Sequence, residues 1–206
     1  MVTIKNITIK MENTIKKSCW MLAMDCETGG IGPDKSLLTA YFALLELNNG
    51  TFTVKDDLDL RIKPDNDIYN VTAESLEITQ IDLKTHNRGA IYQRRAGTML
   101  YDKLKVWQTI AKDKLIVIGH SVAFDIQRVT NDLVSRGSWE QYVSYRVMDT
   151  CTIAQFLRIS GKLPSDLSCS LVNLGKYFNV QVDGIPHEAK YDALVTAKVL
   201  ENLLKH

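Results

Sequence analysis

The sequence predicts a single α/β domain built on a five-stranded mixed sheet, in which an antiparallel three-strand meander is joined by parallel strands and flanked by helices. Three observations support this fold. Trp20–Met24 is an uninterrupted apolar run, typical of a strand buried on both faces. The hairpin turn 48–50 (Asn-Asn-Gly) separates two further strand candidates, Leu37–Leu47 and Thr51–Ile62. Leu115–Gly119 is a short apolar strand that follows a helical pattern, which favours parallel pairing.

The bulk composition is that of an ordinary globular protein. The chain has 206 residues, of which 45% are hydrophobic and 24% charged, and this length suggests one domain with a sizeable core. The formal net charge of +1 argues against a protein held to nucleic acid by bulk electrostatics, although it leaves room for a local basic groove.

The cysteines and apolar stretches predict a reducing, non-membrane setting. The four cysteines form no C-x-x-C pair, so we read them as reduced thiols of a cytoplasmic protein. The longest mainly apolar stretch, Leu37–Leu47, is too short to span a bilayer, and the N-terminus has no signal-peptide pattern. Residues 1–17 are expected to be an extension, either an edge strand or a mobile lead-in, so that residues 18–206 form the domain.

After the meander, the chain alternates between helices and short strands. Thr72 is a possible helix N-cap, residues 84–89 are predicted to be a polar loop, and Tyr92–Ala111 has the apolar spacing of a long helix. Arg88, Arg94 and Arg95 make the most basic local cluster, either a solvated helix start or a rim that contacts phosphates.

The second half continues in the same way. A helix is expected from His120 to about Arg136, and a short strand, 146–148, ends at Asp149. Further helices are predicted at 151–159, at 171–178 and from His187 to about Leu204. On the last one, alanines 189, 193 and 197 recur every four residues, which lets that helix approach the sheet closely.

The first strand ends in a pair of acids. Asp25 and Glu27 lie two residues apart, so in an extended chain their side chains share one side, with Cα atoms about 6–7 Å apart. Two carboxylates at the end of a buried strand repel each other and lose hydration, and a divalent cation would compensate both effects. The alternative is a solvated turn in which Gly29 and Gly30 are simply a loop.

Further acids occur downstream. Asp125 shares the inward side of its helix with Val122 and Val129, where an acid is costly unless it is paired or binds a metal. His187 and Asp192 stand at the start of the last helix, after a break at Pro186.

We call these three positions acidic stations: Asp25 with Glu27, then Asp125, then His187 with Asp192. They resemble the motifs of the DEDDh exonucleases, a branch of the ribonuclease H-like superfamily. The family motif D-x-E-T-x-G matches residues 25–30, H-N-x-x-F-D matches residues 120–125, and H-x-A-x-x-D matches residues 187–192. Order and spacing agree from about residue 19 to 204. Ser121 departs from the pattern, because the family usually has Asn there, and this puts the detailed role of position 121 in doubt.

The resemblance implies a metal-dependent 3′→5′ exonuclease that releases nucleoside 5′-monophosphates. Two cations, Mg²⁺ or Mn²⁺, would be held by the four carboxylates, with His187 as the general base. The implied metal ligands are Asp25, Glu27, Asp125 and Asp192, and the implied substrate contacts are Thr28, Gly29, Ser121 and Phe124. The implied substrate is nucleic acid with a free 3′ end, single-stranded and preferably DNA, with a DNA polymerase as a possible partner. Two alternatives remain open, an RNA-trimming exoribonuclease and a nucleic-acid-binding or polymerase-docking module without catalysis.

Other polar and aromatic residues receive structural interpretations. His120 is expected to form structural hydrogen bonds, Asp149 to cap a helix, and His86 and His206 to be solvated. Trp107 and Trp139 are expected to pack in the core or on the surface and not to stack on bases.

Overall fold

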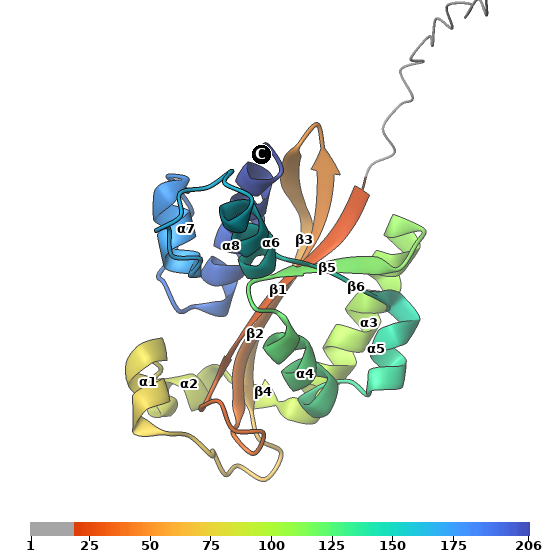
Figure 1. The fold of residues 1–206 in the computed structure, drawn as a ribbon. Coiled ribbons are helices and arrows are strands. Elements are labelled where there is room, and N and C mark those ends of the chain that lie inside the picture. Colours follow the sequence, from red (N-terminus) through yellow and green to blue (C-terminus); the bar gives the residue numbers. More distant parts are fainter. Residues whose placement is uncertain (1–18) are drawn as a thin grey trace, which may run out of the picture.

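The computed structural model describes residues 19–206; the extension predicted for residues 1–17 lies outside them. Within this range the strands form one mixed sheet of six, in the order β4-β3-β2-β1-β5-β6 (Figure 1). The strands are β1 (Cys19–Thr28), β2 (Leu37–Asn48), β3 (Thr51–Lys63), β4 (Ile91–Tyr92), β5 (Leu115–Gly119) and β6 (Val143–Asp149).

The predicted meander is confirmed, but the strand count was too low by one. β1 pairs antiparallel with β2 and β2 antiparallel with β3, while β5 runs parallel to β1 and β6 parallel to β5. The additional strand is β4, whose two residues pair in parallel with Ile62 and Lys63 at the end of β3. A two-residue strand is too short to show a period of two, and Tyr92 was therefore predicted to begin the following helix.

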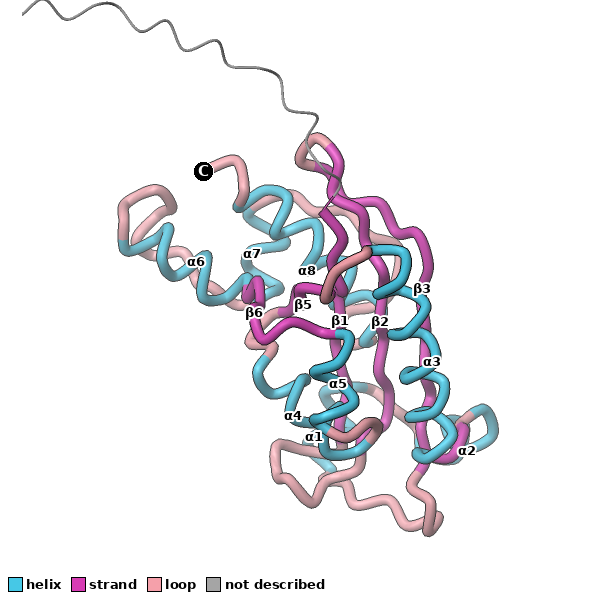
Figure 2. The backbone as a smooth tube through the Cα atoms, turned by 90° about the vertical axis from the view of Figure 1, so that its right-hand side faces the viewer, coloured by secondary structure: helices cyan, strands magenta, loops and turns pink. Residues whose placement is uncertain are grey.

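Helices cover both faces of the sheet (Figures 1 and 2). The helices are α1 (Ala73–Thr79), α2 (Leu83–Gly89), α3 (Gln93–Ala111), α4 (Ala123–Asp132), α5 (Arg136–Tyr142), α6 (Thr150–Ile159), α7 (Leu171–Tyr177) and α8 (Ala189–Leu203). Helices α3, α4 and α5 lie on one face and α6, α7 and α8 on the other, while α1 and α2 sit beside the end of the meander.

Strand β1 contributes side chains to both layers, as its apolar run predicts. Leu22 and Met24 belong to the core cluster that includes residues of α3, whereas Ala23 belongs to the cluster that includes α8. Ala193 and Ala197 of α8 are 0% and 3% exposed against the sheet. The alanine stripe therefore brings α8 close to β1, and it brings the first turn of α8 to the strand end that carries the acids.

Two predicted segments differ from the structure. The helix expected from His120 to Arg136 is instead α4 and α5, because Ser135 begins a new helix by accepting a hydrogen bond from the backbone N–H of Ser138. The polar loop expected at residues 84–89 is the helix α2, capped by Asp82, whose carboxylate accepts from the N–H groups of Lys84 and Thr85. In both cases a local cap decided the helix boundary, and the apolar pattern did not reveal it.

His86 was predicted to be solvated, and this is wrong. It lies on the inner side of α2, is 4% exposed, and its Nε2 lies 2.8 Å from the carbonyl oxygen of Ile62. The short helix α2 turns this residue toward β3. Trp107 and Trp139 are buried in the core, as expected.

None of the helices in residues 19–206 combines the length and the hydrophobicity that a membrane-spanning segment requires.

Candidate active site

The end of β1 presents its two acids to the α8 face of the sheet. Asp25 pairs with Tyr41 of β2 and Glu27 pairs with Thr39, so both carboxylates follow the alternation that places Ala23 against α8. The register shifts between Glu27 and Thr28, where the strand leaves the ladder. Both acids are partly buried.

Within residues 19–206, Glu27, His187 and Asp192 form a cluster of candidate metal ligands. One ligand atom from each residue lies within 4.8 Å of the others. Asp192 is in the first turn of α8, and His187 precedes that helix on a loop, exposed and with a left-handed φ of 66°. The sequence-predicted motif residues of the first and third stations are therefore adjacent in space.

Asp125 reaches the same corner from α4 on the opposite side of β1. Its carboxyl group is buried, with the residue 5% exposed, and Oδ1 accepts a 3.0 Å hydrogen bond from the backbone N–H of Cys26. Cys26 lies between Asp25 and Glu27 in the chain. The second station is thus fixed directly to the first by a hydrogen bond.

The four carboxyl groups act electrostatically on one another. Burial raises the pKa of Asp25 well above its usual range, and the charges of Asp125, Glu27 and Asp192 raise it further. The pKa of Glu27 is raised to about 8, first by burial and then by the charges of Asp192 and Asp125. The charged forms of these acids are therefore disfavoured in the absence of a counter-ion.

Burial also raises the pKa values of Asp125 and Asp192, and nearby groups partly offset each rise. Burial raises the pKa of Asp125 to about 7, while its hydrogen bonds to the backbone, including that of Cys26, act in the opposite direction. Burial also raises the pKa of Asp192, and the charge of His187 opposes this rise.

This donor set fits divalent cations such as Mg²⁺ and Mn²⁺. Carboxylate oxygens are the ligands that these hard cations prefer, and a bound positive charge would favour the ionised forms that burial, and at Asp25 and Glu27 also mutual repulsion, disfavour. No cysteine belongs to the tight cluster found in the described residues, so thiolate-binding metals are a poorer fit.

The predicted substrate contacts lie on the loops beside these acids. Gly29 donates its N–H to the carbonyl of Ser36 and accepts from the N–H of Thr72, each at 2.8 Å. A Cβ atom at Gly29 would come within 2.5 Å of the carbonyl oxygen of Asn70, so this position has no room for a side chain. Thr28 is 9% exposed, and its hydroxyl donates to the carbonyl of Gly30. The segment is held in a fixed conformation.

The two other predicted contacts come from the second motif. Ser121 is exposed and has a φ of 57°, and Phe124 is partly exposed at the start of α4. A left-handed φ is better tolerated by Asn than by most other residues, so this backbone would also accept Asn. Position 121 therefore shapes the turn into α4.

His120 and Asp149 have the structural roles that the sequence predicted. Nδ1 of His120 lies 2.9 Å from the hydroxyl of Thr150, which itself donates to the carbonyl of Gly119. Asp149 caps α6 through the N–H of Thr152, and its other oxygen accepts from the N–H of Val122.

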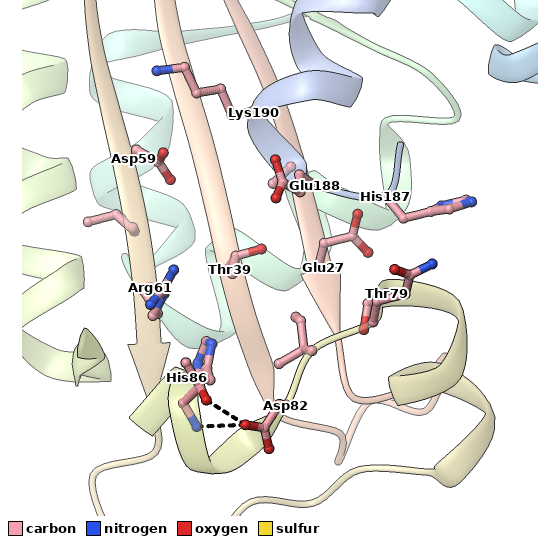
Figure 3. A pocket seen from close by; sticks show the side chains of 15 residues that line it. Glu27, Thr39, Asp59, Arg61, Thr79, Asp82, His86, His187, Glu188 and Lys190 are labelled. Atoms are coloured by element: carbon pink, nitrogen blue, oxygen red, sulfur yellow. Dashed lines mark hydrogen bonds between the residues drawn. The ribbon is translucent and has the colours of Figure 1, made fainter. Parts of the chain in front are cut away.

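A cavity beside the acids includes residues that the sequence analysis did not identify. Its volume is about 410 Å³, and Glu27 and His187 form part of its wall (Figure 3). Arg61 of β3 and Lys190 of α8 also line it. The alternation Asp57, Asp59, Arg61 in the third strand could have revealed a polar face there.

Arg128 of α4 was also missed. It is 2% exposed, and its guanidinium donates to the carbonyls of Pro33 and Lys35 and pairs with Asp132. An arginine at an inward position of the helical pattern is the signal that could have revealed it. Through Arg128, the helix that carries Asp125 also supports the loop that follows Gly29.

Comparisons with known proteins agree with this geometry. A family model, RNase_T, described as "Exonuclease", matches residues 22–200. No curated protein matches the sequence. Among solved structures, Exonuclease I from E. coli in complex with a dT13 oligonucleotide superimposes with a TM-score of 0.67 at 17% identity, covering 90% of this chain and 41% of that chain. Exonuclease I from Methylocaldum szegediense gives a TM-score of 0.69 at 17% identity, covering 91% and 40%.

The chain therefore spans about two-fifths of the length of these two exonucleases. It matches nearly the whole of a third structure, the nuclease domain of 3′hExo, described as a DEDDh family member bound to rAMP. There the TM-score is 0.59 at 15% identity, with 92% of this chain and 94% of that chain covered. The likeness establishes the ribonuclease H-like fold, and the match over most of the sequence shows that this chain belongs to the RNase_T exonuclease family.

Proposed function

We propose that the protein is a 3′→5′ exonuclease that removes terminal nucleotides from single-stranded nucleic acid, preferably DNA, and releases nucleoside 5′-monophosphates. The observation that carries the proposal is the cluster of Glu27, His187 and Asp192, with ligand atoms within 4.8 Å of one another. The carboxyl groups of Asp25 and Asp125 are close enough to interact electrostatically with Glu27 of this cluster.

The four carboxylates are proposed to hold two divalent cations, Mg²⁺ or Mn²⁺. Asp25 would be shared by both ions, Glu27 and Asp192 would complete one site, and Asp125 would serve the other. When bound, such ions neutralise charge at a phosphodiester and stabilise the attacking and leaving oxygens of an in-line displacement. The raised pKa values support this assignment because they identify acids that lack a counter-charge.

The protein's own side chains supply the proton transfer and the positioning. His187 is exposed on its loop and close to Glu27, where its imidazole can accept a proton from the attacking water. The backbone of Thr28 and Gly29 would contact the terminal nucleotide, since that segment is rigid and adjacent to the acids. Phe124, partly exposed, would pack on its sugar or base.

Substrate identity is the finer part of the proposal. Among the related structures, Exonuclease I from E. coli is in complex with a dT13 oligonucleotide, and a 3′-exonuclease is described as recognising a histone mRNA stem-loop, so the fold accommodates both kinds of nucleic acid. We propose DNA as the preferred substrate and RNA as the alternative. The 2′-hydroxyl is the group by which a protein can distinguish them.

Domain extent, partners and location complete the proposal. We assign residues 18–206 to one nuclease domain. The four cysteines are free thiols, which supports a reducing compartment such as the cytoplasm. A polymerase partner remains a prediction of the family resemblance.

A substrate panel tests the proposal. Single-stranded and duplex DNA, duplexes with a mismatched 3′ end, and short RNA are each incubated with Mg²⁺ or Mn²⁺, with and without EDTA. We expect nucleoside monophosphates from single-stranded DNA, slower release from RNA, and none with EDTA. Retention of intact oligonucleotide in every lane, with binding unaffected by EDTA, would instead favour the binding module without catalysis.

A further inference from the structure

The cavity beside Glu27 is not lined by the predicted substrate contacts Thr28, Gly29, Ser121 and Phe124. Its walls are the meander on one side, the segment from His187 to Lys190 on another, and the region from Thr79 to His86 below (Figure 3). Because Glu27 and His187 belong to its lining, the cavity adjoins the proposed reaction centre.

One row of side chains crosses the sheet from the reaction centre into this cavity. Glu27 of β1 pairs with Thr39 of β2, and Thr39 pairs with Arg61 of β3, so the three share one level and one face. Two strand spacings of about 4.8 Å place the Cα atoms of Glu27 and Arg61 ~10 Å apart. The arginine can thus reach a group that lies next to the one undergoing reaction.

Arg61 is a cation of this cavity whose side-chain donors are unused. The residue is exposed, and its guanidinium makes no hydrogen bond or salt bridge within residues 19–206. Its Nη1 lies against the end of α2, 3.2 Å from where a Cβ of Gly89 would stand. Lys190, by contrast, pairs with Asp57 at 3.5 Å and lies over the ring of Tyr41. A guanidinium with free donors is suited to bind a phosphate in bidentate fashion.

The hydroxyl of Thr39 is a second unused polar group. Its Oγ1 is one of three buried side-chain atoms in the described residues that have no hydrogen-bond partner. A buried hydroxyl without a partner is unfavourable, and a ligand bound between Glu27 and Arg61 would supply one.

Several acids line the cavity, but some of them are already engaged and repel a bound anion less than free carboxylates would. Glu27 belongs to the proposed metal site, and Asp82 is engaged as the cap of α2, where it also accepts from the hydroxyl of Thr85. The charges of both Lys190 and Arg61 act favourably on Asp59. Glu188, the residue before α8, is a further, exposed acid of the lining. Thr79, Gln80 and Ile81 form a neutral part of the wall, against which a sugar or base can pack.

We propose that this cavity is a second nucleotide subsite, in which Arg61 binds a phosphate and Thr39 a neighbouring polar atom. A volume of about 410 Å³ lies in the range of small-ligand sites. The inference rests on the proposed nuclease function. The phosphate has two possible sources, the backbone of the bound strand one step from the scissile bond, or the nucleoside monophosphate after its release.

Kinetics of Arg61→Gln separate these sources. The matched control is Arg146→Gln, an exposed arginine of β6 that does not line the cavity. Thymidine di-, tri- and decanucleotides serve as substrates, because the only phosphodiester of a dinucleotide is the scissile one. If Arg61 binds a phosphate of the strand, R61Q raises the KM of the tri- and decanucleotide about tenfold and leaves the KM of the dinucleotide unchanged. For a released product, R61Q instead raises the inhibition constant of thymidine 5′-monophosphate about tenfold.

Direct binding keeps this test independent of the nuclease proposal. The affinities of the decanucleotide and of thymidine 5′-monophosphate are measured in EDTA for the wild type, R61Q and R146Q, after circular dichroism has shown that all three fold. If the wild type releases no nucleotide from any substrate, the proposed function fails, and a loss of affinity confined to R61Q still supports the subsite. Equal behaviour of R61Q and R146Q in both kinetics and binding, or no binding by the wild type, overturns it.

Discussion

The backbone N–H of Cys26 donates a 3.0 Å hydrogen bond to Oδ1 of Asp125, across 99 positions of the chain. This bond joins β1 to α4 at the point where two acidic motifs meet. Asp125 therefore has a structural role in addition to its proposed metal ligation, and the two roles can be separated by substitution.

Asp125→Asn and Asp125→Ala should both abolish hydrolysis but differ in stability. Asn keeps an acceptor for the Cys26 N–H, whereas Ala leaves this buried donor without a partner, at a cost of about 1–3 kcal/mol. Urea unfolding in EDTA checks this prediction. Equal unfolding free energies for the two variants would mean that the hydrogen bond contributes nothing.

The metal-free protein should lose stability as pH rises from about 5 to about 8.5. The folded-state pKa of Glu27 is raised to about 8 and that of Asp125 to about 7, so the folded state holds more protons than the unfolded state in this range. Their stabilising contribution is complete below the usual carboxyl pKa values and is lost as pH rises through the raised ones.

Thermal unfolding from pH 5.5 to 8.5 measures this dependence, with and without 10 mM Mg²⁺. Mg²⁺ should raise the melting temperature more at pH 8.5 than at pH 5.5, because only the ionised acids bind it well. Glu27→Gln, which removes one of the raised groups, should flatten the metal-free profile. A metal-free stability that rises with pH would show that the acids do not form a repelling cluster.

Arg128→Met should destabilise the fold by about 2–4 kcal/mol, because it leaves Asp132 without its buried ion-pair partner and removes the donors to the loop after Gly29. The control is Arg136→Met, whose ion pair with Glu140 is exposed at the surface and should contribute almost nothing. Denaturant midpoints compare the two. Similar small losses of stability in both variants would show that the contacts of Arg128 do not stabilise the fold.

Gly29→Ala should lower both stability and activity. The added Cβ would meet the carbonyl of Asn70 at 2.5 Å, so the loop must shift, at a cost of about 1–3 kcal/mol. Gly137→Ala is the control, because nothing lies within 4 Å of its Cβ position in α5. It should be neutral or slightly stabilising. A Gly29→Ala protein with wild-type KM would argue against a substrate contact at this loop.

The sequence predicted the parts of this fold that depend on strong periodic patterns. The meander, the parallel strand β5 and the small-residue face of α8 follow from apolar alternation, the hairpin turn and the alanine spacing. It did not predict β4 or α2, since a two-residue strand and a short capped helix leave little periodicity. The same limit explains why His86 was placed in solvent.

The acidic residues were accessible to sequence reasoning because their spacing is a local property of each motif. Arg61 was not, because its relation to Glu27 depends on the register of three strands, which brings together residues far apart in sequence. Arg128 was missed because its partners, the carbonyls of Pro33 and Lys35, belong to a loop whose path no side-chain pattern specifies.

The central claim is that the acids from three distant segments, with His187, make one site that acts at a 3′ end. Digestion of a 5′-labelled single-stranded oligonucleotide by the wild type and by Asp192→Asn in Mg²⁺ tests it most directly. The account predicts a ladder of labelled products that shortens by one nucleotide at a time with the wild type, and intact oligonucleotide with D192N. Release of the label as a mononucleotide at the outset, or an equal ladder from D192N, would contradict it.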